Sequence, residues 1–175
     1  MGEKDKLARF EEAILPHMDA AYNIARWLTR NERDAEDMVQ ESYLRAFKFF
    51  DAFTGVNARA WLLTIVRNTC YTWLQQNRGR ELMTEFDEKI HSEENEAWDP
   101  AAQVEKEIDG RMLAQALEAL PAEYREAVVL RDLEGLSYKE IADVVAVPVG
   151  TVMSRLARAR ARLKRLLTER LKEKA

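Results

Sequence analysis

The stretch 136–163, LSYKEIADVVAVPVGTVMSRLARARARL, constrains the fold of this chain more than any other. Ser137 and Glu140 form the pattern S-x-x-E, which begins a helix as a capping box because each side chain accepts a backbone N–H of the other residue. The residues that follow give this helix an apolar face: Ile141, Val144 and Val145. Pro148 suits the first position of a second helix, where its missing N–H costs nothing. The stretch therefore predicts two short helices joined by a turn.

The second predicted helix carries an apolar face beside a basic one. Apolar residues recur at helical spacing along one side: Val152, Leu156, Ala159, Leu163 and Leu167. Hydroxyl and guanidinium groups cluster on the neighbouring side: Thr151, Ser154, Arg155, Arg158, Arg162 and Arg165. Arginine suits a DNA groove because its planar fork bonds to guanine edges or phosphates. A run of arginines alone more often marks a solvated helix, but with the capping box and the turn it favours a DNA-binding helix-turn-helix.

The net charge of −4 conceals a segregation of charge along the chain. Residues 81–110 include 11 acidic and 2 basic residues, whereas residues 151–175 include 9 basic and 2 acidic ones. Local patches decide where a polyanion binds, so the acidic total does not exclude nucleic acid as a partner. A hydrophobic content of 47% is enough to build a core, in one domain or in two small ones.

Several classes of protein are disfavoured by what the chain contains. Cys70 is the single cysteine, so no internal disulfide can form, and its apolar surroundings predict a buried side chain. Together with His17 and His91 it shows no metal-ligand spacing, and we expect neither a metal site nor a cofactor. No signal peptide or transmembrane run is apparent, which predicts a cytoplasmic protein. No Gly-rich phosphate loop, nucleophile elbow or HExxH motif is present, so we expect no enzyme.

The remaining sequence predicts helices and no strands. In the N-terminal half, Asp34 is expected to cap a helix that runs to about Phe50, and a loop around Gly55 leads to another helix over 58–77. In the C-terminal half, Pro121 is expected to start a helix that ends near Leu133.

Gly135 should follow that helix in the left-handed conformation. The predicted fold is all-α, with two small helical domains, 7–80 and 111–175, joined by a flexible acidic linker, 81–110.

Two segments resemble the bacterial sigma-70 family of RNA polymerase sigma factors, in the small extracytoplasmic-function (ECF) group that keeps only regions 2 and 4. They are DAEDMVQESYLRAFKFFDAF to WLLTIVRN within 34–68, and LPAEYREAVVLRDLEGLSYKEIADVVAVPVGTVMSRLARARARL at 120–163. The resemblance implies a factor that directs core RNA polymerase to promoters in a stress response. Its expected partners are the β′ clamp helices and β flap of the polymerase, promoter DNA, and an anti-sigma factor that clamps both domains.

The resemblance assigns two sets of residues in the first domain. Polar contacts with the β′ clamp helices are expected from Asp37, Gln40 and Glu41, although a merely solvated helix face would look the same. Melting and reading of the −10 element would use Phe53, Asn57, Arg59, Trp61, Arg67 and Asn68. Aromatic groups can stack on unpaired bases, polar groups read base edges, and cations bind the backbone.

Within this set, Trp61 has a second explanation and Asn68 has a specific counterpart in the family. Trp61 also lies on the apolar stripe of its helix and is equally well explained as a core residue. Asn68 matches the position that contacts the flipped base in related factors. Upstream duplex DNA would face the polar tail of the domain, Gln75, Gln76, Asn77, Arg78 and Arg80.

In the second domain, the resemblance places the −35 element against the helix-turn-helix. Groove contacts are expected from Ser154, Arg155 and Arg158, and phosphate contacts from Tyr138, Lys139, Thr151 and Arg162. The acidic linker would thread through the polymerase towards its active-centre cleft, or act as a plain solvated tether.

Three features depart from the family pattern. Val145-Ala146 stands where many relatives have Leu-Gly, so a left-handed Ala146 would cost about 1 kcal/mol. Met153 stands where some relatives have a basic residue, which removes one possible DNA contact. The loop after Phe53 is about one residue shorter than in some members, so Asn57 and Arg59 are assigned less securely than Asn68.

Two other functions remain as alternatives. A stand-alone helix-turn-helix regulator would need a dimer to set half-site spacing, and no long heptad seam is present. A protein that binds polymerase or an anti-sigma factor without reading DNA would leave the basic C-terminal helix unexplained. DNA binding with and without core polymerase separates the three.

Overall fold

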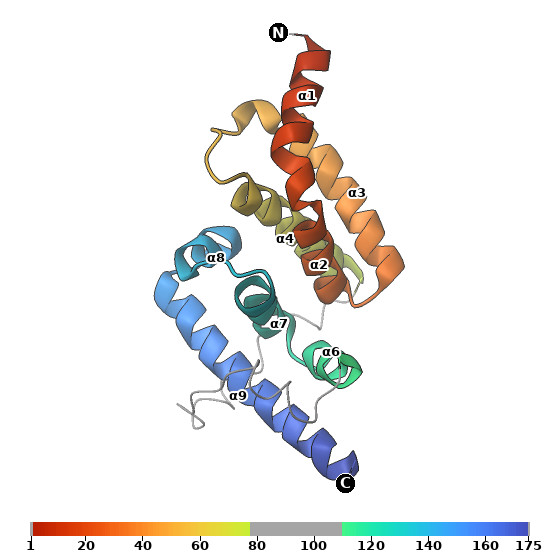
Figure 1. Cartoon of the computed structure of the whole chain (residues 1–175), viewed down its shortest axis with the longest axis vertical. Coiled ribbons are helices and arrows are strands. Elements are labelled where there is room, and N and C mark those ends of the chain that lie inside the picture. The colour runs from red at the N-terminus through yellow and green to blue at the C-terminus, as the bar shows by residue number, and fades with distance from the viewer. Residues whose placement is uncertain (1, 78–109, 175) are drawn as a thin grey trace.

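The computed structural model describes residues 2–77 and 110–174, and within these ranges every regular element is helical. This part of the chain forms two helical units, which confirms the predicted all-α class (Figure 1). The predicted acidic linker lies almost wholly outside the described residues. The first unit comprises α1 (Glu3–Ile14), η1 (Leu15–His17), α2 (Met18–Thr29), α3 (Glu32–Lys48), η2 (Phe50–Ala52) and α4 (Ala58–Asn77). The second comprises α6 (Gly110–Glu118), α7 (Ala122–Val128), the π-helical turn η3 (Val129–Leu133), α8 (Tyr138–Val145) and α9 (Val149–Lys174).

In the first unit, α2 packs against both α3 and α4, and α3 also contacts α4. Phe10 of α1 is fully buried and meets the rings of Tyr43, Phe47 and Phe50 edge to face, with centroids 4.9, 5.2 and 5.3 Å away. Edge-to-face pairs of this kind add to the free energy gained by burying the rings. Cys70 of α4 is buried in the same core, as the sequence predicted.

The start of α3 differs from the expectation that Asp34 caps it. Asn31 has an extended backbone, and its Oδ1 accepts the N–H of Asp34 at 3.0 Å. Asp34 therefore lies inside the first turn, where its charge suits the helix dipole. Both side chains can cap a helix, and the extended backbone required of a cap residue falls on Asn31.

The helix-turn-helix of the second unit forms as predicted. The Ser137 hydroxyl accepts the N–H of Glu140 at 3.1 Å, and the Glu140 carboxylate accepts the N–H of Ser137 at 2.9 Å, so the capping box is complete. Ala146 ends α8 in the left-handed conformation, with φ 58° and ψ 48°. Pro148 immediately precedes α9 instead of occupying its first position, and its carbonyl accepts the N–H groups of Thr151 and Val152.

The helix expected to run from Pro121 to about Leu133 does so, but its second half is a π-helical turn. Gly135 follows this turn with φ 73°, as predicted for a left-handed stop. The turn keeps Val129 and Leu130 buried while Arg131 and Asp132 are half-buried. Asp132 can thereby accept hydrogen bonds from Nη2 and Nε of Arg160 on α9, at 2.6 and 3.1 Å.

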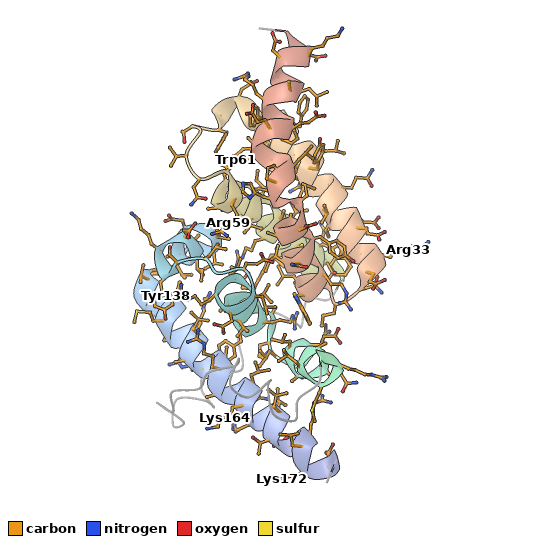
Figure 2. The ribbon with its side chains drawn as sticks, in the orientation of Figure 1. Arg33, Arg59, Trp61, Tyr138, Lys164 and Lys172 are labelled. Atoms are coloured by element: carbon orange, nitrogen blue, oxygen red, sulfur yellow. The ribbon has the colours of Figure 1, made fainter. Side chains whose placement is uncertain are left out.

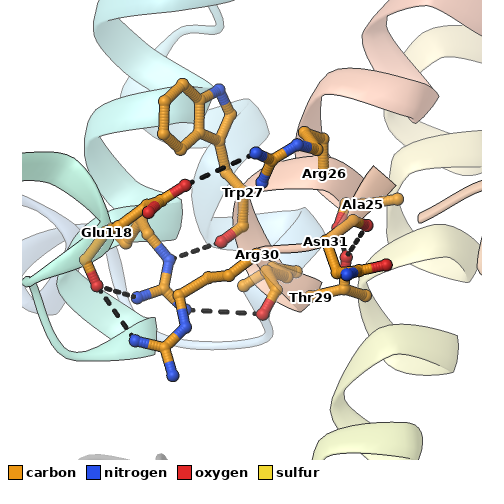
Figure 3. Close-up of polar contacts among 9 residues, drawn as sticks. Ala25, Arg26, Trp27, Thr29, Arg30, Asn31 and Glu118 are labelled. Carbon is orange, nitrogen blue, oxygen red and sulfur yellow. Dashed lines mark hydrogen bonds and ion pairs between the residues drawn. The ribbon is translucent and has the colours of Figure 1, made fainter. Parts of the chain in front are cut away.

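The two units lie against each other, α2 beside α7 and α4 beside α8 (Figure 1). One apolar cluster runs through both, because Leu62 and Val66 of α4 belong to the same buried group as Leu130 and Ile141 of the second unit. Polar contacts also join the two units, and Figure 3 shows some of them, where Glu118 of α6 faces Arg26 and Arg30 of the first unit. The first and second units therefore form one body in this structure.

Candidate nucleic-acid interface

The helix-turn-helix presents its predicted DNA-binding residues on and beside α9. Lys139 is exposed, whereas Tyr138, Thr151, Ser154, Arg158 and Arg162 are half-buried. The Ser154 hydroxyl donates to the carbonyl of Thr151 at 3.1 Å, so these two residues are held together near the start of the helix. The structure brings this set together on one unit, with Tyr138 of α8 near the start of α9 (Figure 2).

Two of the α9 arginines are held by carboxylates of the same unit. Arg155 forms an ion pair with Glu123 of α7 at 3.3 Å, and its side chain is 20% exposed. Arg160, which the sequence did not single out, donates to Asp132 through Nε and Nη2, and hydrogen bonding to that carboxylate raises the pKa of Arg160. Arg131 lies over the ring of Tyr138 with its guanidinium 4.6 Å from the centroid. Arg160 and Arg131 thus fix the orientation of α9 and Tyr138 instead of adding to a groove surface.

The aromatic −10 candidates form a cluster at the start of α4. Phe53 stacks on Phe50 with ring centroids 5.8 Å apart, and Trp61 lies 5.0 Å from Phe53 and 6.3 Å from Phe50. Phe53 and Trp61 are half-buried and pack against the core. Each therefore serves the core and also keeps part of its surface accessible for stacking.

Asn57, just before α4, and Arg59, in its first turn, both contact the second unit. Asn57 has φ 52°, and its Oδ1 caps α4 by accepting the N–H of Ala60 at 3.1 Å. Its Nδ2 donates to the Glu140 carboxylate at 2.9 Å. Arg59 donates to the Glu134 carbonyl at 3.3 Å and pairs with Glu140 at 3.6 Å (Figure 2).

The pKa of Glu140 is lowered, mainly by the backbone N–H of Ser137 and next by the side chain of Asn57. The charged form of this carboxylate is therefore the one that the fold stabilises.

Arg67 is more enclosed than Arg59, since their side chains are 16% and 32% exposed. Its Nε and Nη2 donate to the two carboxylate oxygens of Glu126 on α7 at 3.0 and 3.2 Å. Its guanidinium also lies 3.8 Å from the centroid of the Tyr71 ring. Burial alone would lower the pKa of Arg67, but the Glu126 carboxylate outweighs it and the pKa is raised.

Asn68, one residue further, is exposed and so are Gln75, Gln76 and Asn77. Arg78 and Arg80, expected beside them, lie outside the described residues. The neighbours Asn68 and Arg67 therefore differ in accessibility. Asn68 is open to solvent, whereas Arg67 is covered by the second unit.

The candidate polymerase-binding residues lie on the open face of α3. Asp37, Gln40 and Glu41 are exposed, and Glu41 pairs with Arg45 at 2.8 Å. Sequence reasoning missed Leu44, which is 63% exposed and continues this face at helical spacing. An apolar residue three positions after Glu41 on an otherwise polar face was the signal available for it.

A second group of residues could not be found from the sequence, namely the carboxylates and carbonyls of the second unit that hold Asn57, Arg59 and Arg67. Glu126 belongs to an ordinary helix pattern, and its partner lies 59 residues away. Within the described residues, no group of three potential metal ligands occurs and no helix is both long and apolar enough to span a membrane.

The folded chain is a two-unit helical protein with a capped helix-turn-helix and a basic recognition helix, the class of DNA-associated regulators. Comparison with known families is consistent with that class. Residues 13–80 match the model of sigma-70 region 2, and residues 110–163 match that of sigma-70 region 4.

Curated relatives extend this similarity to nearly the whole chain. The ECF RNA polymerase sigma factor SigE of Mycolicibacterium smegmatis is 34% identical over 174 residues, which are 99% of this chain and 67% of the relative. The ECF RNA polymerase sigma-E factor of Escherichia coli K12 is 36% identical, over 73% of this chain and 70% of the relative. The chain therefore belongs to the ECF group of the sigma-70 family.

Solved structures agree with this assignment. The sigma factor RpoE in complex with the anti-sigma factor NepR from Bartonella quintana matches with a TM-score of 0.70 and 32% identity, over 91% of this chain and 97% of the other. CnrH in complex with the cytosolic domain of CnrY matches with a TM-score of 0.65 and 28% identity, over 91% and 88% of the two chains.

Proposed function

We propose that this chain is a sigma factor that binds core RNA polymerase and directs promoter-specific initiation. The observation that carries the proposal is the pairing, in one chain, of a basic helix-turn-helix with an all-helical unit that bears aromatic and cationic groups. Neither unit alone would support this proposal. A helix-turn-helix reads duplex DNA, whereas the aromatic groups of the first unit suit unpaired bases.

In this proposal each unit has a distinct task. The domain at 7–80 binds the β′ clamp helices through the exposed face of α3, with Asp37, Gln40 and Glu41, and opens the −10 element. The residues proposed for that step are Phe53, Asn57, Arg59, Trp61, Arg67 and Asn68. The domain at 111–175 reads the −35 element and contacts the β flap. Its groove residues are Ser154, Arg155 and Arg158, with Tyr138, Lys139, Thr151 and Arg162 on phosphates.

The same proposal covers location, catalysis and regulation. The polymerase carries out the chemistry, and this chain contributes binding and positioning only. A factor that works with polymerase on DNA acts in the cytoplasm. Two similar structures were solved with an anti-sigma factor or the partner CnrY, which supports a protein of that kind as a regulator of this chain.

Run-off transcription tests this function against its alternative. Purified core polymerase is combined with a library of promoter-like DNA, with and without this protein. Initiation from defined starts that depend on two upstream elements is the expected result. Absence of initiation, together with sequence-specific binding by the protein alone, would instead identify a stand-alone helix-turn-helix regulator.

A further inference from the structure

Two apolar side chains at the start of α9 are exposed beside the proposed groove residues. Met153 is 52% exposed and Val149 is 40% exposed. They stand four residues apart on the helix, so their side chains are neighbours on its surface. The apolar residues of the same helix that face the core, Val152 and Leu156, are each 1% exposed. Val149 and Met153, which we call the apolar flank, belong to neither buried cluster of the described residues.

The apolar flank and the arginines lie on different sides of α9. At about 100° per residue, Met153 and Arg155 point about 160° apart. Between these two directions, on the side away from the core, stand Gly150 and Ala157, which are both exposed. A Cβ added at Gly150 would meet no atom within 4 Å, so this side of the helix is open.

The small residues on that open side decide how closely α9 can approach DNA. An α-helix with its side chains is about as wide as the major groove, roughly 10–12 Å. A helix whose outermost residues are glycine and alanine can lie deep in the groove. Side chains on both of its flanks then reach the edges of base pairs.

The apolar flank matches one particular group in the major groove. The C5-methyl of thymine is the apolar group that base pairs present there, whereas the other groups are hydrogen-bond donors or acceptors. A donor or acceptor placed against an apolar side chain would lose water without gaining a partner. Methionine suits contact with a methyl group, because its unbranched thioether side chain is polarisable and adapts its shape.

The position of the apolar flank favours DNA over a protein surface as its partner. Residues near the start of a recognition helix contact base edges, and Val149 begins α9 while Met153 follows one turn later. Two side chains supply only a small part of the roughly 800 Å² per partner that a stable protein interface buries. Polar and cationic residues surround them, namely Ser154 and Arg158 on α9 and the exposed Lys139 on α8. Cations attract phosphates and thereby bring base edges within reach of the helix.

We propose that the apolar flank reads thymine in the −35 element, with Met153 packed against a thymine C5-methyl and Val149 widening the apolar surface beside it. The proposal deepens the proposed function and rests on it, since it presumes that α9 enters the major groove. Arginines on the other side of the helix read hydrogen-bonding edges, so the two sides specify different kinds of base pair. Met153 is thus a specificity-determining residue.

Replacement of thymine by uracil tests the proposal, because it removes the C5-methyl and leaves the hydrogen-bonding groups of the base pair unchanged. The −35 element is first selected from a duplex library with holoenzyme formed from core polymerase and the full-length chain. Each thymine of the selected element, on either strand, is then replaced by uracil in turn. Fluorescence anisotropy measures the binding of each labelled duplex by holoenzymes that contain the wild type, Met153→Ala or Met153→Leu.

We expect uracil at the contacted position to weaken binding by the wild type about fourfold, the loss that corresponds to one buried methyl group. Met153→Ala should bind the thymine duplex more weakly than the wild type does and should be insensitive to the same replacement. Met153→Leu should keep most of the sensitivity, because it keeps an apolar side chain of similar volume. The matched control is Leu133→Ala, which removes an equally exposed apolar side chain from η3 and should keep the wild-type profile.

Three results would overturn the proposal. The first is a selected element without thymine, and the second is a uracil profile that is the same for the wild type and Met153→Ala. The third is a loss of core polymerase by Met153→Ala in a pull-down without DNA, which would assign the apolar flank to a protein partner. Because Met153 is exposed, its substitutions should leave the fold intact, and circular dichroism checks this.

Run-off transcription separates this proposal from the proposed function. A chain that supports no initiation would defeat the proposed function, and the uracil series is then run on a duplex selected by the protein alone. Sensitivity that depends on Met153 in that series would still support the thymine contact, and failure to select any duplex would defeat it. A chain that initiates normally, but has no uracil position that depends on Met153, would defeat the thymine contact alone.

Discussion

Arginines that look equivalent in the sequence of α9 have different surroundings in the structure. Arg155 is paired with Glu123, and Arg160 is bound to Asp132. The periodicity of the helix identified which of its sides is basic, and the family resemblance then singled out Arg155 and Arg158 as groove residues. It could not show that Arg160 has an acidic partner, because that depends on the π-helical turn, for which the sequence carries no distinct signal.

Arg158→Ala should weaken promoter binding by about 1–3 kcal/mol and relax the preference at one base pair of the −35 element. The loss is specific because an arginine that reads a base edge discriminates between bases, whereas a phosphate contact does not. Binding of polymerase holoenzyme to a set of −35 variants measures the effect. Arg170→Ala, on the same helix but paired with Gln115, is the control and should leave the preference unchanged. An unaltered preference in the Arg158 variant would remove it from the groove.

Asp37→Arg should weaken binding to core polymerase, because it reverses a charge on the exposed face of α3 that we assign to the β′ clamp helices. Pull-down of core polymerase with the full-length chain provides the measurement. Glu36→Arg makes the same change at the preceding exposed residue, whose side chain points away from this face of the helix, and it should have a smaller effect on polymerase binding. Undiminished recovery of polymerase by the Asp37 variant would exclude this residue from the interface.

The beginnings and ends of helices show which local features a sequence determines. Ser137 and Glu140 were predicted as a capping box and form one, because both partners lie within four residues. Asn31 was missed because two capping residues stand close together and only the backbone conformation decides between them. Ala146 was expected to be strained if left-handed, and its φ of 58° confirms that conformation.

Ala146→Gly should raise the free energy of unfolding by about 1 kcal/mol, because glycine adopts the left-handed conformation without the steric cost of a Cβ. Ala157→Gly makes the same change at an exposed position inside α9 and should lower the free energy of unfolding by about 1 kcal/mol. Urea unfolding of the two variants beside the wild type measures both signs. Destabilisation by both variants would show that the left-handed Ala146 carries no strain.

At the scale of the whole molecule, the sequence predicted two helical domains but not the contact between them. Hydrophobic periodicity identifies the buried face of each helix, and Leu62 and Ile141 were each compatible with the core of their own domain. Their membership of one common cluster depends on the position of α4 against α8, a contact between segments far apart in the chain. The same holds for Arg67 and Glu126, so Arg67 was identified by its type while its contact with the second unit was not.

Acidification should weaken the contact that Glu140 makes with both the α8 cap and the first unit. Because the fold lowers the pKa of Glu140 below its usual value of 4.5, the stability it contributes is present above that value and is lost as the pH falls through the lower folded pKa. Glu140→Gln keeps hydrogen-bonding capacity but cannot titrate. We expect the free energy of unfolding to fall less in this variant than in the wild type as the pH is lowered from neutral into the acidic range.

Urea unfolding across this pH range, with Asp132→Asn as a variant that leaves Glu140 titratable, provides the comparison. Parallel pH profiles for Glu140→Gln and the wild type would show that the lowered pKa of Glu140 does not contribute to stability.

The contact between Arg67 and Glu126 joins the two units through a pair of charges that are both largely buried. Such a pair fixes geometry more than it adds net stability, and removing one partner alone leaves the other charge buried without compensation. These two positions can therefore be changed together more readily than one at a time.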